Sequence, residues 1–163
     1  KRFDGIYDIS ERLGKPLYIH TGTSPNPYTR MEPPYVDPLY LEESIKKYPG
    51  AIFIMGHSGY DSFLVKLTYL DSCIELAKKY ENVYIEPGAL GSRKASEILP
   101  IYLKRMKEEG IIDRVIYGSD GPQFPGYTAS HLNNMIDAME EVGYTGLEMK
   151  AVLESNFERV FDL

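Results

Sequence analysis

Three apolar runs of the sequence each end in a side chain that can bind a metal ion or transfer a proton. His20 follows the run PLYI, His57 follows AIFIMG, and Asp120 follows RVIYGS. Imidazole and carboxylate groups suit Zn, Mn or Fe(II) in a mixed nitrogen and oxygen site, and they also act as general acids and bases. Taken singly, the histidines could bond backbone groups and Asp120 could cap a turn. Their repetition at equivalent positions favours a shared site.

The spacing of these runs predicts how they come together. Four expected strands begin at residues 16, 51, 83 and 114, and a helical pattern fills each interval between them. Such repeats form parallel sheets with right-handed crossovers, and ligands gather at the carboxyl ends of parallel strands. We therefore expect an α/β protein with outer helices. Its four strands fit either an open sheet or half of a TIM-type (β/α)8 barrel.

Hydrophobic periodicity predicts the connecting elements. Helices are expected over about residues 3–13, 39–48, 62–80 and 94–109, then over a segment that contains 132–142, and finally after a capping box made by Thr145 and Glu148. Residues 21–38 contain five prolines and no periodicity, which is typical of a functional loop. We expect this loop and residues 121–128 to rim the site.

The inner face of the predicted sheet should be apolar. Alternation along the strands places Tyr18, Ile54, Tyr84 and Ile116 on this face. Half a barrel would leave such a face and two sheet edges uncovered, which favours association. We therefore expect a homo-oligomer or a complex with a separate partner half.

Charge and cysteine content limit the partners and the compartment. The 163 residues include 18 Lys and Arg against 24 Asp and Glu, and the formal charge of −6 offers no footprint for nucleic acid or an anionic membrane. The single cysteine, Cys73, cannot form an intrachain disulfide. The sequence also shows no signal-peptide pattern and no apolar run long enough to span a bilayer. We expect a cytoplasmic protein that acts on a small molecule.

Two further side chains are candidates for substrate binding. Glu86 ends the third apolar run, where it could face the same site or simply belong to the turn that follows. Tyr60 is the tyrosine nearest to His57 in sequence. Both are predicted to contact the substrate.

Three other polar residues fit structural roles better. Arg93 and Lys94 could meet an anionic substrate group, but their position is more typical of a solvated helix start. His131 follows TAS at another predicted helix start, where a histidine usually packs at the surface or boundary. We leave His131 out of the predicted site.

Together the motifs PLYIHTG, FIMGHSG, NVYIEPG and VIYGSD and the closing NFERVF resemble the C-terminal half of the amidohydrolase superfamily. The similarity is greatest to the branch that contains aminocarboxymuconate-semialdehyde decarboxylase and many metal-dependent hydrolases. It implies that residues 1–163 form a single domain with strands 5 to 8 of the barrel. It also implies that His20 and Asp120 bind a divalent metal, Zn with Mn or Fe as alternatives, and that His57 and Asp120 are catalytic.

The sequence departs from the family at one point. The family's first strand carries a His-x-His pair that supplies two further metal ligands, and this sequence contains no such pair. A catalytic zinc normally keeps three protein ligands, so His20 and Asp120 alone should hold metal weakly or not at all. The resemblance therefore implies that the N-terminal half-barrel is missing from this chain.

The resemblance implies one of two reactions. A hydrolase acting on an amide, ester or lactone would use the metal to lower the pKa of water, Asp120 to accept its proton and His57 to polarise or protonate the substrate. A decarboxylase of a small unsaturated or aromatic acid would use the metal and His57 to stabilise a carbanion-like intermediate. A third alternative is a non-catalytic half-barrel that associates with a partner half.

Overall fold

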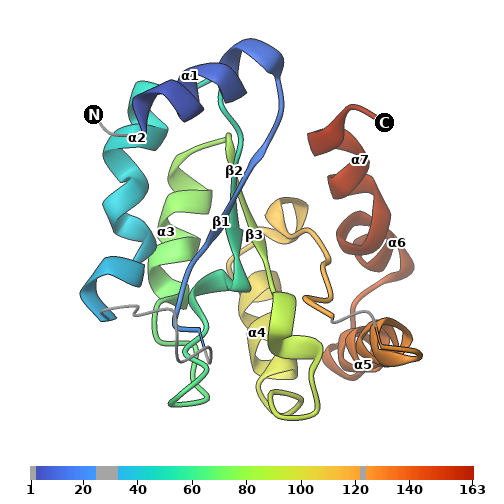
Figure 1. Ribbon diagram of the computed structural model, residues 1–163. Coiled ribbons are helices and arrows are strands. Elements are labelled where there is room, and N and C mark those ends of the chain that lie inside the picture. The colour runs from blue at the N-terminus through green and yellow to red at the C-terminus, as the bar shows by residue number, and fades with distance from the viewer. Residues whose placement is uncertain (1–2, 25–32, 122–123) are drawn as a thin grey trace.

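A parallel sheet forms the centre of the computed structural model, which describes residues 3–24, 33–121 and 124–163. Its order is β1-β2-β3, with bounds β1 (Leu17–His20), β2 (Phe53–Gly56) and β3 (Val83–Glu86). The strands run from top to bottom in Figure 1, and the register aligns His20, Gly56 and Glu86 at their carboxyl ends. The predicted α/β class with parallel strands is confirmed.

The fourth predicted strand, expected to start at residue 114 and to end before Asp120, is reduced to a single bridge. Val115 pairs in parallel with Ile85, and Ile116 donates its N–H to the carbonyl of Ile85 at 3.0 Å. The next amide, that of Tyr117, donates instead to the carbonyl of Val152 at 3.0 Å. The prediction of a full strand is wrong here because the next bond of this parallel ladder would need an N–H at residue 87, which is a proline and has none.

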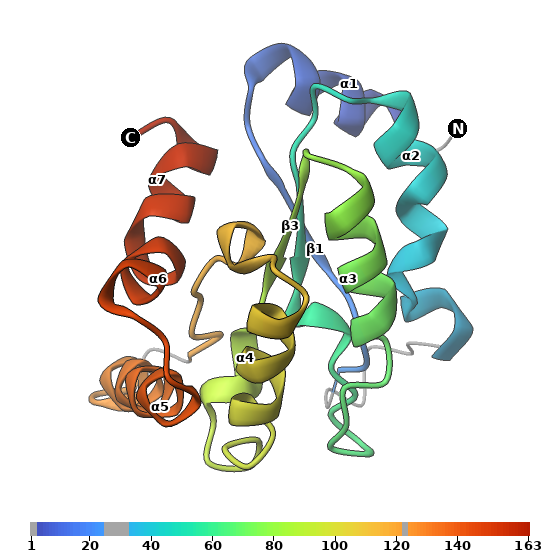
Figure 2. The same ribbon diagram turned by 180° about the vertical axis from the view of Figure 1, so that it is seen from behind.

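Helices and helical turns surround the sheet (Figures 1 and 2). The described residues form α1 (Asp4–Leu13), α2 (Glu42–Lys47), α3 (Leu70–Lys79), α4 (Leu99–Glu108), α5 (Tyr127–Val142), α6 (Gly146–Lys150) and α7 (Asn156–Phe161), with a π-helical segment (Ala151–Ser155) between the last two. Short 3-10 helices cover Pro33–Val36, Pro38–Leu41, His57–Gly59, Gly88–Gly91 and Ile112–Arg114. The predicted capping box is confirmed at the start of α6. None of the described helices has the length and apolar character needed to cross a membrane.

Two helices begin later than predicted. The helix expected from residue 62 starts at Leu70, because the Asp61 carboxylate accepts the N–H groups of Phe63 and Leu64, each at 3.0 Å, and folds this segment into a turn. The helix expected from residue 94 starts at Leu99. Its second residue is Pro100, which is well placed in a first helical turn because its missing N–H is not needed there.

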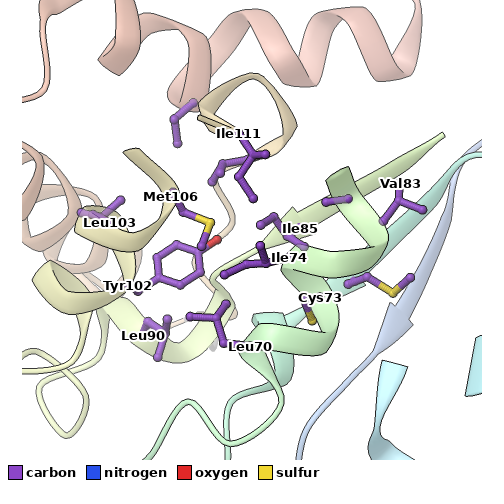
Figure 3. Packing of buried hydrophobic residues seen from close by; sticks show 14 of the residues in the cluster. Leu70, Cys73, Ile74, Val83, Ile85, Leu90, Tyr102, Leu103, Met106 and Ile111 are labelled. Carbon is purple, nitrogen blue, oxygen red and sulfur yellow. The ribbon is translucent and has the colours of Figure 1, made fainter. Parts of the chain in front are cut away.

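The main core lies between the sheet and helices α3 and α4. Phe53 and Met55 of β2 and Val83 and Ile85 of β3 are fully buried on this side. Figure 3 shows the side chains of the two helices that pack there, Leu70, Cys73, Ile74, Tyr102, Leu103 and Met106. This packing fixes the strands, and with them the residues at their carboxyl ends.

The opposite face of the sheet is better covered than predicted. Ile54, Tyr84 and Ile116 are buried in a second cluster with Val160 of α7. Only Tyr18 is largely exposed among the four residues expected to be uncovered. The prediction is wrong for the other three because α7 folds back over them.

Candidate functional site

His20, His57 and Asp120 lie together at the carboxyl ends of the strands. The ring centres of His20 and His57 are 4.4 Å apart, and Nδ1 of His57 is 3.9 Å from Oδ2 of Asp120. His20 is the last residue of β1, His57 directly follows β2, and Asp120 follows the segment that is bridged to β3. The structure therefore brings together the three side chains that the sequence singles out.

The backbone at this site is strained. His57, Ser58 and Asp120 have φ angles of 65°, 48° and 47°, in the left-handed region that side chains other than glycine rarely adopt. Ser58 is held there because its buried hydroxyl donates to the carbonyl of Glu86 at 2.9 Å. Such strain costs on the order of 1–3 kcal/mol per residue and clusters at functional sites.

Burial sets the protonation of the two histidines. Desolvation lowers the pKa of His20, and the negative charge of Asp120 only partly opposes this. Desolvation and the neighbouring His20 also lower the pKa of His57, again against the effect of Asp120. Both rings are therefore favoured as neutral imidazoles near pH 7, the form that binds metal and accepts protons.

Glu86 lies beneath the histidines as a buried anchor. Its Oε2 accepts the hydroxyl of Tyr18 at 2.7 Å and the N–H of His57 at 3.2 Å, and its Oε1 accepts the N–H of Gly88 at 2.7 Å. Tyr18 reaches across β2 only because Gly56 leaves room, since a Cβ there would lie 2.3 Å from the tyrosine ring. Burial raises the pKa of Glu86. The substrate contact expected of Glu86 stays a prediction.

A pocket of about 430 Å³ opens beside the three converging side chains. Tyr60 and Tyr127 line it together with His20, His57 and Asp120. Its volume suits a small organic molecule. The role of Tyr60 in substrate binding stays a prediction. Parts of the two loops expected to rim the site, residues 25–32 and 122–123, lie outside the described residues.

Sequence reasoning missed His131. This buried side chain of α5 has Nδ1 at 2.8 Å from the carbonyl of Ser119, the residue before Asp120, and its ring faces that of Tyr127 at 4.3 Å. It therefore helps to position the Asp120 segment. The available signal was the apolar stripe of the helix, because His131 lies one turn before the buried Met135.

The side chains of His20 and Asp120 are of types that bind divalent metal ions, but a catalytic zinc site normally has three protein ligands. His20 offers an imidazole and Asp120 a carboxylate, both ordinary ligands of Zn or Mn. Within residues 3–24, 33–121 and 124–163, however, no group of three or more His, Cys, Asp and Glu side chains is arranged to hold an ion.

A parallel α/β sheet with acid–base residues at its carboxyl ends is the design of TIM-barrel enzymes and related folds. A family model described as "Amidohydrolase" matches residues 1–163. The chain therefore belongs to the amidohydrolase family.

Similar proteins include both hydrolases and decarboxylases. Protein fluG of Emericella nidulans is 27% identical over 128 residues, which are 78% of this chain and 14% of that protein. A TIM-barrel protein of Bordetella bronchiseptica has a TM-score of 0.69 at 17% identity, over 98% of this chain and 50% of its own. A probable 2-pyrone-4,6-dicarboxylic acid hydrolase of Acinetobacter baumannii, with citric acid bound, has a TM-score of 0.65 at 17% identity, over 94% and 54%.

A 5-carboxyvanillate decarboxylase of Novosphingobium aromaticivorans, complexed with manganese, has a TM-score of 0.58 at 22% identity, over 99% of this chain and 51% of that one. The chain thus spans about half the length of these solved structures. At these identities the likeness shows the fold. Together with the family match it confirms the resemblance to the amidohydrolase superfamily and fits the branch named from the motifs.

Proposed function

We propose that the chain is the C-terminal, catalytic-site half of a metal-dependent hydrolase that cleaves an amide, ester or lactone bond of a small molecule. The observation that carries this proposal is the meeting of His20, His57 and Asp120 in one pocket at the carboxyl ends of the strands. The family match and the hydrolase among the structural neighbours support it.

The three side chains have separate tasks in this proposal. His20 and Asp120 would hold the ion, which when bound lowers the pKa of water and polarises the substrate. The exposed carboxylate of Asp120 can accept the proton of the attacking water. His57 is buried and fixed by its backbone bond to Glu86, and its Nδ1 lies 3.9 Å from Oδ2 of Asp120. As a neutral imidazole it can take up the proton that Asp120 removes from the water and pass it to the leaving group.

Decarboxylation of a small unsaturated or aromatic acid is the second candidate. It is favoured by the manganese-bound decarboxylase among the neighbours. In this reaction His57 would help to stabilise the carbanion-like intermediate, and a proton taken up from solvent would replace the carbon dioxide that leaves. The two reactions can be distinguished by their products. Hydrolysis of esters and lactones releases a proton, whereas decarboxylation of 2-hydroxybenzoic acids releases carbon dioxide.

Metal analysis of the chain tests the metal binding that both candidate reactions require. After reconstitution with Zn or Mn, the chain alone is expected to hold less than one equivalent, and Asp120→Asn to hold less still, because half of the ligand shell is absent. Addition of a half-barrel that carries the His-x-His pair should raise the content to a full equivalent and stabilise the fold.

Asp71→Asn is the matched control, because Asp71 is a highly exposed carboxylate on α3, away from the site. It should leave the metal content unchanged. Stoichiometric metal in the chain alone that survives Asp120→Asn would contradict the proposal, since the ligands would then lie elsewhere.

We also propose that residues 1–163 are one domain, equivalent to barrel strands 5 to 8, and that it associates through α1 and the free edge of β1. Ile6, Ile9 and Leu13 of α1 are 52%, 48% and 64% exposed. No described strand pairs with β1 on the side away from β2. An exposed apolar stripe beside an open sheet edge is a typical association surface. A non-catalytic half-barrel, the third candidate function, would associate through the same surface.

Sedimentation velocity is expected to show a dimer or larger species as the chain concentration rises. Ile9→Glu should shift this equilibrium toward monomer, because a charge would then be buried in the contact. Ile101→Glu on α4 should not, although Ile101 is an exposed isoleucine as well, at 58% against 48% for Ile9. A wild-type chain that stays monomeric at every concentration would argue against this surface.

A further inference from the structure

The carboxyl group of Glu86 links the three strands. Its Oε2 accepts the Tyr18 hydroxyl, from β1, at 2.7 Å and the N–H of His57, which follows β2, at 3.2 Å. Its Oε1 accepts the N–H of Gly88, in the segment after β3, at 2.7 Å. Glu86 is 4% exposed and is not among the described residues that line the pocket. This buried group therefore ties β1 to the segments that follow β2 and β3, and it does so from behind the pocket.

Two glycines leave the space that this carboxyl group and the His57 ring occupy. A Cβ at Gly118, two residues before Asp120, would lie 2.2 Å from Oε1 of Glu86. A Cβ at Gly88 would lie 2.5 Å from Nδ1 of His57 and 3.1 Å from Oε2 of Glu86. The ring and the carboxyl group thus border the same point. Because residue 88 has no side chain to support the ring, the position of the ring depends on the backbone bonds that Glu86 accepts.

The backbone of His57 is held in place by Glu86 in two ways. Its φ of 65° lies in the left-handed region, which residues other than glycine keep only where the surroundings impose it. The side chain of Glu86 accepts the N–H of His57, and the carbonyl of Glu86 accepts the hydroxyl of the next residue, Ser58, at 2.9 Å. These bonds hold the strained turn that places Nδ1 of His57 at 3.9 Å from Oδ2 of Asp120.

We infer that Glu86 and Tyr18 form a positioning pair that holds His57 beside Asp120 for proton transfer. Glu86 acts on the reaction through His57, and the Tyr18 hydroxyl fixes the Glu86 carboxyl group from β1. This inference rests on the proposed function, in which His57 passes a proton to the leaving group. It gives Glu86 a different role from the substrate contact that the sequence predicts.

Glu86→Gln should lower kcat about 10²-fold, the scale of a displaced catalytic group, and leave KM nearly unchanged. Whichever way the new amide points, its NH2 group faces the N–H of His57 or that of Gly88, which then loses its acceptor. The amide proton of one of these two residues should therefore exchange with solvent about tenfold faster or more. The amide of Phe53 in β2, which bonds the carbonyl of Asn82 at 2.8 Å, should keep its exchange rate. A merely structural loss would speed the exchange of all three amides.

Tyr18→Phe is the second variant, because it removes only a hydroxyl group from a side chain that is 54% exposed, so the chain should still fold. It should lower kcat about tenfold at unchanged KM, the effect of one lost charge-assisted hydrogen bond. Tyr117→Phe is the matched control, because within the described residues the buried hydroxyl of Tyr117 has no hydrogen-bond partner. With no bond to lose, it should change kcat by less than about twofold.

Double variants separate this inference from the proposed function. In a His57→Asn background, Glu86→Gln should not lower kcat further, because a positioning residue acts only through the group that it positions. Losses that multiply, a change in KM alone, or equal losses for Tyr18→Phe and Tyr117→Phe would overturn the inference and leave the proposed function standing. A His57→Asn variant as active as the wild type would refute the proposed function instead, and the amide exchange rates would still decide whether Glu86 holds His57.

Discussion

Replacing His57 by asparagine is expected to lower kcat about 10³-fold in whichever reaction, hydrolysis or decarboxylation, the protein catalyses. An amide side chain cannot take up a proton near neutral pH, whereas burial lowers the pKa of His57 and so favours a neutral imidazole that can accept a proton and pass it on. Asparagine is the suitable replacement because it tolerates the left-handed backbone at this position, where φ is 65°. Steady-state rates of the two proteins, with the more active metal, measure the effect.

The same variant separates catalysis from metal binding. In the proposed site His57 is not a metal ligand, so His57→Asn should keep the wild-type metal content and nearly the wild-type melting temperature. Asp120→Asn should lose both metal and activity. If His57→Asn lost metal to the same extent as Asp120→Asn, His57 would be a ligand and its assigned role would be wrong.

The sequence predicted the structural features that depend only on residues close together in the chain. The helix before Gly14 and the capping box of Thr145 and Glu148 depend on residues a few positions apart, and the structure confirms them. The strand expected from residue 114 and the helix start expected at residue 62 failed for a different reason. In the first case the neighbouring strand β3 is followed by Pro87, which has no N–H to donate to the next position of the ladder. In the second, Asp61 folds its own segment into a turn before the helical pattern begins.

The features of the candidate site also differ in how far the sequence predicts them. The convergence of His20, His57 and Asp120 follows from topology alone, because parallel strands place their carboxyl ends at one edge. The bond from Tyr18 to Glu86 does not, since it needs a tyrosine two strands away and the empty space above Gly56. Lys94, which lines the pocket, is equally hard to place, because its contact with Ser62 joins two loops.

A second large effect is expected from Gly22→Ala, which should lower the free energy of unfolding by about 3 kcal/mol or more. Gly22 has a φ of 86°, and a Cβ there would lie 2.1 Å from the carbonyl oxygen of Tyr60. This close approach lets Thr23 donate its N–H to that same oxygen at 3.1 Å. It thereby ties the loop after His20 to the loop after His57. Backbone atoms cannot move aside as a flexible side chain would, so the two loops must separate.

Gly14→Ala isolates the steric part of this effect. Gly14 also has a left-handed backbone, with a φ of 60°, but no atom lies within 4 Å of the position its Cβ would take. The backbone penalty alone should therefore cost about 1 kcal/mol. Urea denaturation of the two variants and the wild type measures both values. Equal losses would show that the approach of Gly22 to Tyr60 does not hold the loops together. A larger loss for Gly22→Ala would show that this contact holds the two loops together.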